Sequence, residues 1–180
     1  MLWKKAYAYF IATVLFIGLL FFLWYKQPQT PLSALEKHSE NEPTIKYSTM
    51  IKQIDMASGE SLLFYYNYNK NLACAVIKKQ FGFYKVISVS SEIACNSDSL
   101  RAGMLGAGYE DDKTFKCLIW GIIYDSAVKK LVSNNNEAQQ FEGPGLRLFY
   151  TINEGSLNFD CRLYDSAGIE LPLLLSDKET

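Results

Sequence analysis

The first 26 residues constrain this chain more than any other segment. Residues Ala6 to Tyr25 (AYAYFIATVLFIGLLFFLWY) form an unbroken run of twenty residues without a charge or a proline. A helix rises about 1.5 Å per residue, so the run covers about 30 Å, the thickness of a bilayer's hydrocarbon core. Lys4 and Lys5 precede the run, and Lys26 follows it directly. Residues 6–25 are therefore predicted to form a transmembrane helix.

The end of the run distinguishes a permanent anchor from a cleaved signal peptide. A signal peptide has an apolar region of about 7–15 residues, followed by a small-x-small cleavage site. This run is longer and ends in the bulky residues Leu23, Trp24 and Tyr25. Trp3 and Trp24 bracket it, and such rings favour the level of the lipid headgroups. The sequence predicts an uncleaved anchor, with a signal peptide as the alternative.

The short basic tail before the run sets the expected orientation. Residues 1–5 carry Lys4 and Lys5, and so short a tail suits an N-terminus that stays in the cytoplasm. The protein is then a single-pass cell-membrane protein whose long C-terminal part lies outside.

The exported part is acidic overall. Without Lys4, Lys5 and Lys26 the chain keeps 15 of its 18 basic residues against all 19 acidic ones, so residues 27–180 carry a net charge of −4. This balance argues against nucleic acid as a partner and disfavours adhesion to anionic lipid. Because almost half of the chain is apolar, we expect one folded domain with a hydrophobic core.

Two segments lie between the anchor and the first expected strand. Residues 26–43 hold three of the five prolines and the only histidine, His38, which indicates a mobile or loosely helical stalk. In residues 44–57 the apolar side chains follow mixed three- and four-residue spacings, which predicts one short flanking helix that ends before Gly59. That helix either covers the core or contacts a partner.

From Glu60 onward the pattern changes to short β-rich runs separated by Gly and Asn. Strands are predicted at 62–68, 72–79, 83–90, 114–124, 128–132, 138–141, 146–152, 157–164 and 169–174. The run at 114–124 is apolar on both faces and should be central. The expected fold is a mainly-β domain over residues 44–176, an antiparallel sandwich or a partly open barrel, followed by a tail at 177–180.

Alternation predicts which side chains face the core of two strands. In residues 146–152, Arg147 and Thr151 are expected to face solvent, opposite the apolar residues. In residues 157–164 the inward face is expected to hold Leu157, Phe159, Cys161 and Leu163.

The four cysteines, Cys74, Cys95, Cys117 and Cys161, all follow the anchor. Because each lies in or near an apolar strand, they are expected to be buried free thiols, and one or two disulfides are the alternative. Their spacings of 21, 22 and 44 residues do not resemble a zinc site, whose ligands come in close pairs.

No catalytic, cofactor-binding or metal-binding residue can be named from the sequence. His38 lies in the predicted stalk, which leaves no histidine for a nucleophile–base pair. Gly103, Gly106 and Gly108 lack the spacing of a phosphate loop and predict a flexible loop or a strand entrance. The acidic residues 110–112 predict a solvated turn. Asp125 and Asp160 could meet in the fold, although nothing selects this pair of carboxylates over another.

Several segments resemble a family of small membrane-anchored β ectodomains of Bacillus-like Gram-positive bacteria. They are AVIKKQFGFYKVIS (75–88), LIWGIIYDSAVKKLV (118–132), LRLFYTI (146–152) and CRLYDSAGIEL (161–171). The resemblance covers residues 60–175 and implies an anchored β domain. It brings no activity, cofactor or site residue with it.

These observations favour a non-enzymatic interaction module held at the outer membrane surface. Its partner is an unidentified protein, peptide or envelope polymer, and tethering allows even weak contacts to be effective. One alternative is an accessory subunit of a membrane complex, and another is a hydrolase that uses carboxylates or a cysteine. The oligomeric state is left open.

Overall fold

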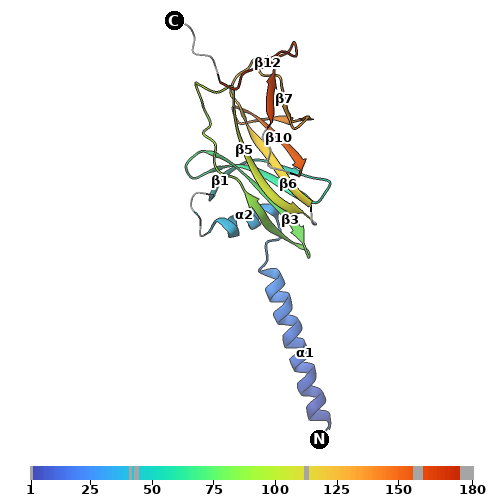
Figure 1. The fold of residues 1–180 in the computed structure, drawn as a ribbon. Coiled ribbons are helices and arrows are strands. Elements are labelled where there is room, and N and C mark those ends of the chain that lie inside the picture. The colour runs from blue at the N-terminus through green and yellow to red at the C-terminus, as the bar shows by residue number, and fades with distance from the viewer. Residues whose placement is uncertain (1, 41, 43–44, 112–113, 156–159, 175–180) are drawn as a thin grey trace.

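A long helix leads into a domain of stacked antiparallel sheets (Figure 1). This computed structural model describes residues 2–40, 42, 45–111, 114–155 and 160–174, and within the first helix it describes the side chains at positions 3, 7 and 9–25. The elements are α1 (Leu2–Tyr25), α2 (Pro31–Ser39), β1 (Tyr47–Asp55), β2 (Glu60–Asn67), β3 (Leu72–Gln80), β4 (Phe83–Val89), β5 (Ala102–Asp111), β6 (Thr114–Ile123), β7 (Lys130–Ser133), β8 (Asn136–Glu137), β9 (Gln139–Gly143), β10 (Leu146–Glu154), β11 (Cys161–Tyr164) and β12 (Glu170–Leu171).

The strands form three four-stranded sheets in which every strand pair is antiparallel. The first sheet has the order β1-β2-β3-β4, the second β5-β6-β10-β9 and the third β12-β11-β7-β8. Neighbours in the first sheet follow one another along the chain, as tight turns allow for antiparallel strands. The mainly-β class predicted from the sequence is confirmed.

Three apolar clusters hold the layers together. The first lies between sheets one and two and includes Phe64 of β2 and Trp120 of β6, whose ring centroids are 6.0 Å apart. The second lies between sheets two and three around Phe149, and the third places Leu35 of α2 against the outer face of the first sheet. The order of layers is therefore α2, sheet one, sheet two and sheet three.

The strands in the middle of this stack are buried on both faces. In β6, Leu118, Trp120 and Ile122 enter the first cluster, whereas Cys117 and Ile119 enter the second. Side chains that alternate across a strand reach two different cores only when a layer covers each face. The predicted central position of residues 114–124 is confirmed.

The one-sided burial predicted for residues 146–152 is wrong. Leu148 and Phe149 are both fully buried, and Thr151 is also buried. Arg147 donates a hydrogen bond from Nη2 to the carbonyl oxygen of Asp125 at 2.7 Å. The third sheet covers the face that alternation assigned to solvent, and that covering depends on contacts distant in the sequence.

The helix predicted at residues 44–57 is wrong, because residues 47–55 form the edge strand β1. Irregularities in the β1–β2 register lie between Tyr47 and Thr49 and between Met50 and Lys52. Tyr47 and Met50 pack toward α2, whereas Ile51 and Ile54 pack into the first cluster. The shifts of register give each face a three-residue spacing, because a bulge adds a residue to the period of two. This spacing imitates a helix.

The short flanking helix lies instead within the predicted stalk, as α2. Thr30 accepts a hydrogen bond from the Ser33 amide, and the Ser33 hydroxyl accepts one from the Thr30 amide, so the pair forms a capping box ahead of Pro31. Ala34 and Leu35 are buried against the first sheet. Proline and polar composition indicated a mobile stalk, but here Pro31 begins a helix that packs on the domain.

The glycine-rich segment, for which the sequence left a flexible loop or a strand entrance open, forms strand β5. It pairs with β6 residue by residue from Ala102 to Asp111. Position 121 of β6 accepts only glycine, because a Cβ there would lie 1.9 Å from the carbonyl oxygen of Gly103. Two glycines of β5 leave room for side chains, because a Cβ at Gly108 would lie 2.6 Å from the Phe115 ring and one at Gly103 would lie 2.7 Å from the Tyr124 hydroxyl oxygen.

Helix α1 extends away from the domain (Figure 1). Every described side chain from Tyr9 to Tyr25 is exposed, including Phe16 at 60%. Over the residues that the structure describes, no helix reaches both the length and the hydropathy that a membrane span requires.

Candidate functional site

The densest group of charged side chains lies between sheets one and two. Lys116 of β6 contacts Glu60 of β2 at 2.8 Å and Asp111 of β5 at 2.6 Å. Asp111 also pairs with Lys78 of β3. We call these four residues the ion-pair network. Its two carboxylates are buried, with Glu60 only 1% exposed.

Strand pairing brings the network together. Glu60 is opposite Lys78 in the first sheet, and Tyr109 is opposite Lys116 in the second. Each member lies near the end of its strand, so the network closes one end of the first apolar cluster. It joins two sheets by charge where the apolar packing ends.

The network favours the charged forms of Asp111 and Lys116. Hydrogen bonding to Lys116 and Lys78 lowers the pKa of Asp111, and hydrogen bonding to Asp111 and Glu60 raises the pKa of Lys116. Burial raises the pKa of the nearby Tyr109 to about 12. A general acid or base works best with a pKa near the working pH, and these shifts all lead away from neutrality. The arrangement supports a structural role.

A surface groove of about 380 Å³ lies between α2 and β4. Its lining includes Lys37 and His38 of α2 with Tyr84 and Lys85 of β4. Among the described residues that line it there is no cysteine, aspartate or glutamate. The groove is therefore basic and aromatic, and its chemistry suits binding of an anion better than nucleophilic catalysis.

The connection between α1 and the domain runs beside this groove. The Tyr84 amide donates a hydrogen bond to the Pro28 carbonyl oxygen at 2.9 Å, so the linker lies beside the edge of β4. The Gln29 side chain donates to the Trp24 carbonyl oxygen at 3.2 Å. A Cβ added to Gly82, in the β3–β4 turn, would lie 3.6 Å from the Trp24 indole nitrogen. The groove and the turn thus lie at the C-terminal end of α1.

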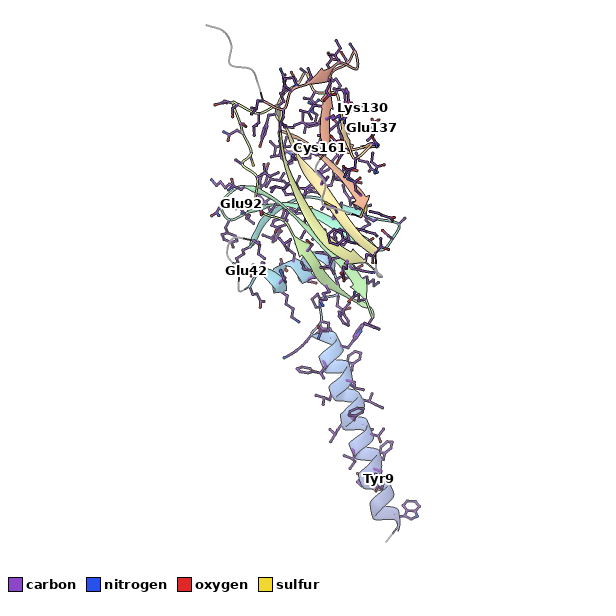
Figure 2. The ribbon with its side chains drawn as sticks, viewed as in Figure 1. Tyr9, Glu42, Glu92, Lys130, Glu137 and Cys161 are labelled. Atoms are coloured by element: carbon purple, nitrogen blue, oxygen red, sulfur yellow. The ribbon has the colours of Figure 1, made fainter. Side chains whose placement is uncertain are left out.

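All four cysteines are free thiols. Cys74 and Cys117 are buried, and Cys95 and Cys161 are half-buried. Burial raises the pKa of each thiol. Cys161 lies opposite Ser133 of β7, in the part of the domain distant from Tyr9 (Figure 2). The thiols are protonated at neutral pH and behave as small apolar side chains. Leu157 and Phe159 lie outside the described residues.

The other residues singled out from the sequence have separate partners. Asp125 pairs with Arg101, and Asp160 contacts Arg162 at 3.2 Å, so each carboxylate has its own arginine. Asp111 is buried and ion-paired, which corrects the predicted solvated turn at this position, and Asp112 lies outside the described residues. Within the described part of the chain, no three His, Cys, Asp or Glu side chains gather as metal ligands would.

His38 and Lys37, both within the predicted stalk, join the candidate site. The stalk prediction put His38 away from the domain, but α2 brings it to the rim of the groove. The residues missed from the sequence are those of the ion-pair network and the groove. The Thr30-Pro31 capping signal could have located α2 and hence His38, whereas nothing local relates Glu60 to Lys116.

No protein-family model, curated protein or solved structure matches this chain. The resemblance to the membrane-anchored β ectodomains therefore stays a prediction.

Proposed function

We propose that the chain is a single-pass membrane protein whose β domain lies outside the cytoplasm and acts as a non-enzymatic binding module. The observation that carries the anchor is α1 itself. It is 24 residues long and contains the uncharged run 6–25, and its described apolar side chains are exposed and lie away from the domain. Exposed apolar area of this extent has a large free-energy cost in water, and a bilayer removes that cost.

The binding role is supported by the chemistry of the domain. The ion-pair network keeps its charges, the thiols are protonated and the groove brings lysines and a tyrosine together without a nucleophile–base pair. A tethered domain with such a groove is suited to hold a partner at the membrane surface.

Membrane integration and topology are tested on cells that express the full chain. After the cell wall is removed, protease added from outside should degrade the β domain, while a cytoplasmic marker protein stays intact. In the same membranes, alkaline carbonate should leave the chain in the pellet. Full protection from protease would overturn the topology, and release by carbonate would overturn the anchor.

The binding role is tested by cross-linking in the same cells. A photoreactive residue at exposed positions of the domain should give discrete adducts, whose partners are identified by mass spectrometry. A matched photoreactive residue at the buried position Trp120 serves as the control. If no exposed position gives an adduct above this control, the binding module is contradicted.

A further inference from the structure

We propose that the domain docks on the bilayer that holds α1, through the phosphate groups of anionic phospholipids and with the Phe81 ring inserted among the headgroups. This inference rests on the proposed anchor. The docking surface consists of the β3–β4 turn with Phe81, the groove between α2 and β4, and the exposed lysines Lys26, Lys37, Lys79 and Lys85. We call it the membrane-proximal face.

The position of this face follows from its contacts with the end of α1. Gly82 lies beside the indole of Trp24, and Pro28 is hydrogen-bonded to the backbone of Tyr84. A tryptophan at the end of a membrane helix lies at headgroup level. The β3–β4 turn next to it is then within reach of the lipid surface, as the arrangement of α1 and β3 illustrates (Figure 1).

Phe81 is exposed in a way that a solvent-facing turn does not explain. Its side chain is 92% exposed, the largest value among the large apolar side chains that the structure describes. Its φ of +52° falls in the left-handed region, which aromatic residues rarely adopt and which Asn or Gly would occupy at lower cost. Phe side chains can be buried at the boundary between headgroups and acyl chains, so contact with lipid would offset the exposure.

The charges around Phe81 match an anionic surface. Lys79 and Lys85 follow the two strands of the hairpin away from the turn, and both are exposed. Lys37, His38 and Lys85 line the groove, whose volume of about 380 Å³ suits a phosphate group with part of its headgroup. Two carboxylates, Glu36 and Glu40, line the adjacent hollow together with Lys26 and Lys37, so the exposed lysines remain in excess.

Charge is also distributed unevenly along the whole chain, with the basic excess next to α1. Residues 26–85, which form the linker, α2 and most of the first sheet, hold eight basic and five acidic residues. Residues 86–180 hold eight basic and fourteen acidic ones. The net charge of −4 for residues 27–180, which disfavours adhesion to anionic lipid, therefore averages a basic part next to α1 and an acidic remainder.

The test uses the full chain reconstituted in vesicles of phosphatidylcholine alone or mixed with phosphatidylglycerol. Phe81→Trp adds one indole, whose fluorescence is the difference between the variant and the parent chain. Lipids brominated near the headgroup quench this added fluorescence when the indole touches the lipid. We expect quenching in the mixed vesicles and much weaker quenching in phosphatidylcholine. Each lysine near an anionic surface favours the bound state about fivefold. The double variant Lys79→Gln with Lys85→Gln should therefore lower the ratio of domains docked on the bilayer to undocked domains about 25-fold.

The matched control replaces two lysines of similar exposure at the third sheet, Lys129→Gln with Lys130→Gln, and should leave quenching unchanged. Flotation of the vesicles in alkaline carbonate checks the anchor in the same samples. If the chain floats with the vesicles but the introduced indole stays unquenched in both lipid mixtures, the docking proposal is wrong and the anchor proposal still holds. Chain that is released from the vesicles overturns both. Equal loss of quenching in the two double variants also overturns the proposed surface.

Discussion

Helix α1 and strand β6 are both strongly apolar, but they end in opposite environments. From Tyr9 to Tyr25 every described side chain of α1 is exposed, whereas β6 is fully buried from Cys117 to Ile122. Apolar content alone therefore does not distinguish a strand in a protein core from an exposed helix. The two elements also differ in length, because β6 has ten residues and α1 has 24.

The comparison also shows what each region depends on. Strand β6 is held by two layers of side chains from other sheets, and its burial would disappear if the domain unfolded. Helix α1 satisfies its backbone hydrogen bonds internally and needs no tertiary contact for its shape. A substitution in β6 should therefore lower the stability of the domain, and an equivalent one in α1 should leave that stability unchanged.

The largest effect is expected from Trp120→Ala in β6. Removing a buried aromatic side chain costs about 3–5 kcal/mol of the free energy of unfolding, because a cavity remains. Phe16→Ala in α1 is the matched variant and should leave the unfolding of the domain unchanged. Urea unfolding of the full chain in lipid discs, followed by circular dichroism of the strands, measures both. If Trp120→Ala does not fold, Ile119→Val should still cost about 1 kcal/mol. Equal effects in α1 and β6 would remove the distinction.

A smaller loss is expected from Lys116→Met, which leaves the buried carboxylates of Glu60 and Asp111 without this partner. Breaking a buried ion pair costs about 3 kcal/mol. Lys130→Met is the control, because its pair with Glu137 is exposed and worth about 1 kcal/mol or less. Similar losses in the two variants would contradict a special role for the network.

The pH dependence of unfolding sharpens this prediction. Because folding lowers the pKa of Asp111, its contribution is present above the ordinary value of 3.8 and is lost as the pH falls below it. Folding raises the pKa of Lys116 above 10.5, so its contribution is present below 10.5 and is lost as the pH rises through the folded value. Lys116→Met should weaken both the acid and the alkaline dependence, as measured by urea unfolding across this range; Tyr109 and the thiols, whose pKa values burial raises, keep part of the alkaline one.

A moderate effect is expected where the two regions connect. Thr30→Ala removes the side-chain cap of α2 and should cost about 1 kcal/mol. Thr13→Ala in α1 removes only a side-chain bond to the Tyr9 carbonyl and should not change domain stability. Both are measured by urea unfolding. No loss for Thr30→Ala would contradict a stabilising α2.

The last prediction concerns the thiols and involves no substitution. Their alkylation tests burial directly. Without reductant, Cys74 and Cys117 should stay unlabelled in the folded protein, and Cys95 and Cys161 should react slowly. Unfolding should then expose four reactive thiols, counted by mass spectrometry. Fewer than four would reveal a disulfide.

The sequence predicted the elements whose pattern is local and regular. Strands β2, β3, β4 and β6 follow from β-rich runs between Gly and Asn turns. Strand β1 was missed because its bulges give a helical spacing, and β5 was missed because its glycines make room for the side chains of Phe115 and Tyr124. Both errors come from reading a tertiary requirement as a local signal.

The candidate site was harder to predict for a physical reason. The ion-pair network joins Glu60 to Lys116 across 56 positions, and only the stacking of two sheets brings them together. The groove depends on α2 folding back over β4, for which the capping of Thr30 and Ser33 was a visible sign. The net charge of residues 27–180 as a whole also hid the excess of basic residues in residues 26–85.

The hydrogen bond between the Pro28 carbonyl and the Tyr84 amide has a mechanical consequence. If a bound partner pulls the domain outward, the force enters at the edge of β4 and must pass through this bond before it reaches α2. A helix of nine residues lengthens from about 14 Å to about 30 Å when it is drawn out. Under load, α2 should then uncoil before the sheets separate, and its lengthening should limit the force that reaches them.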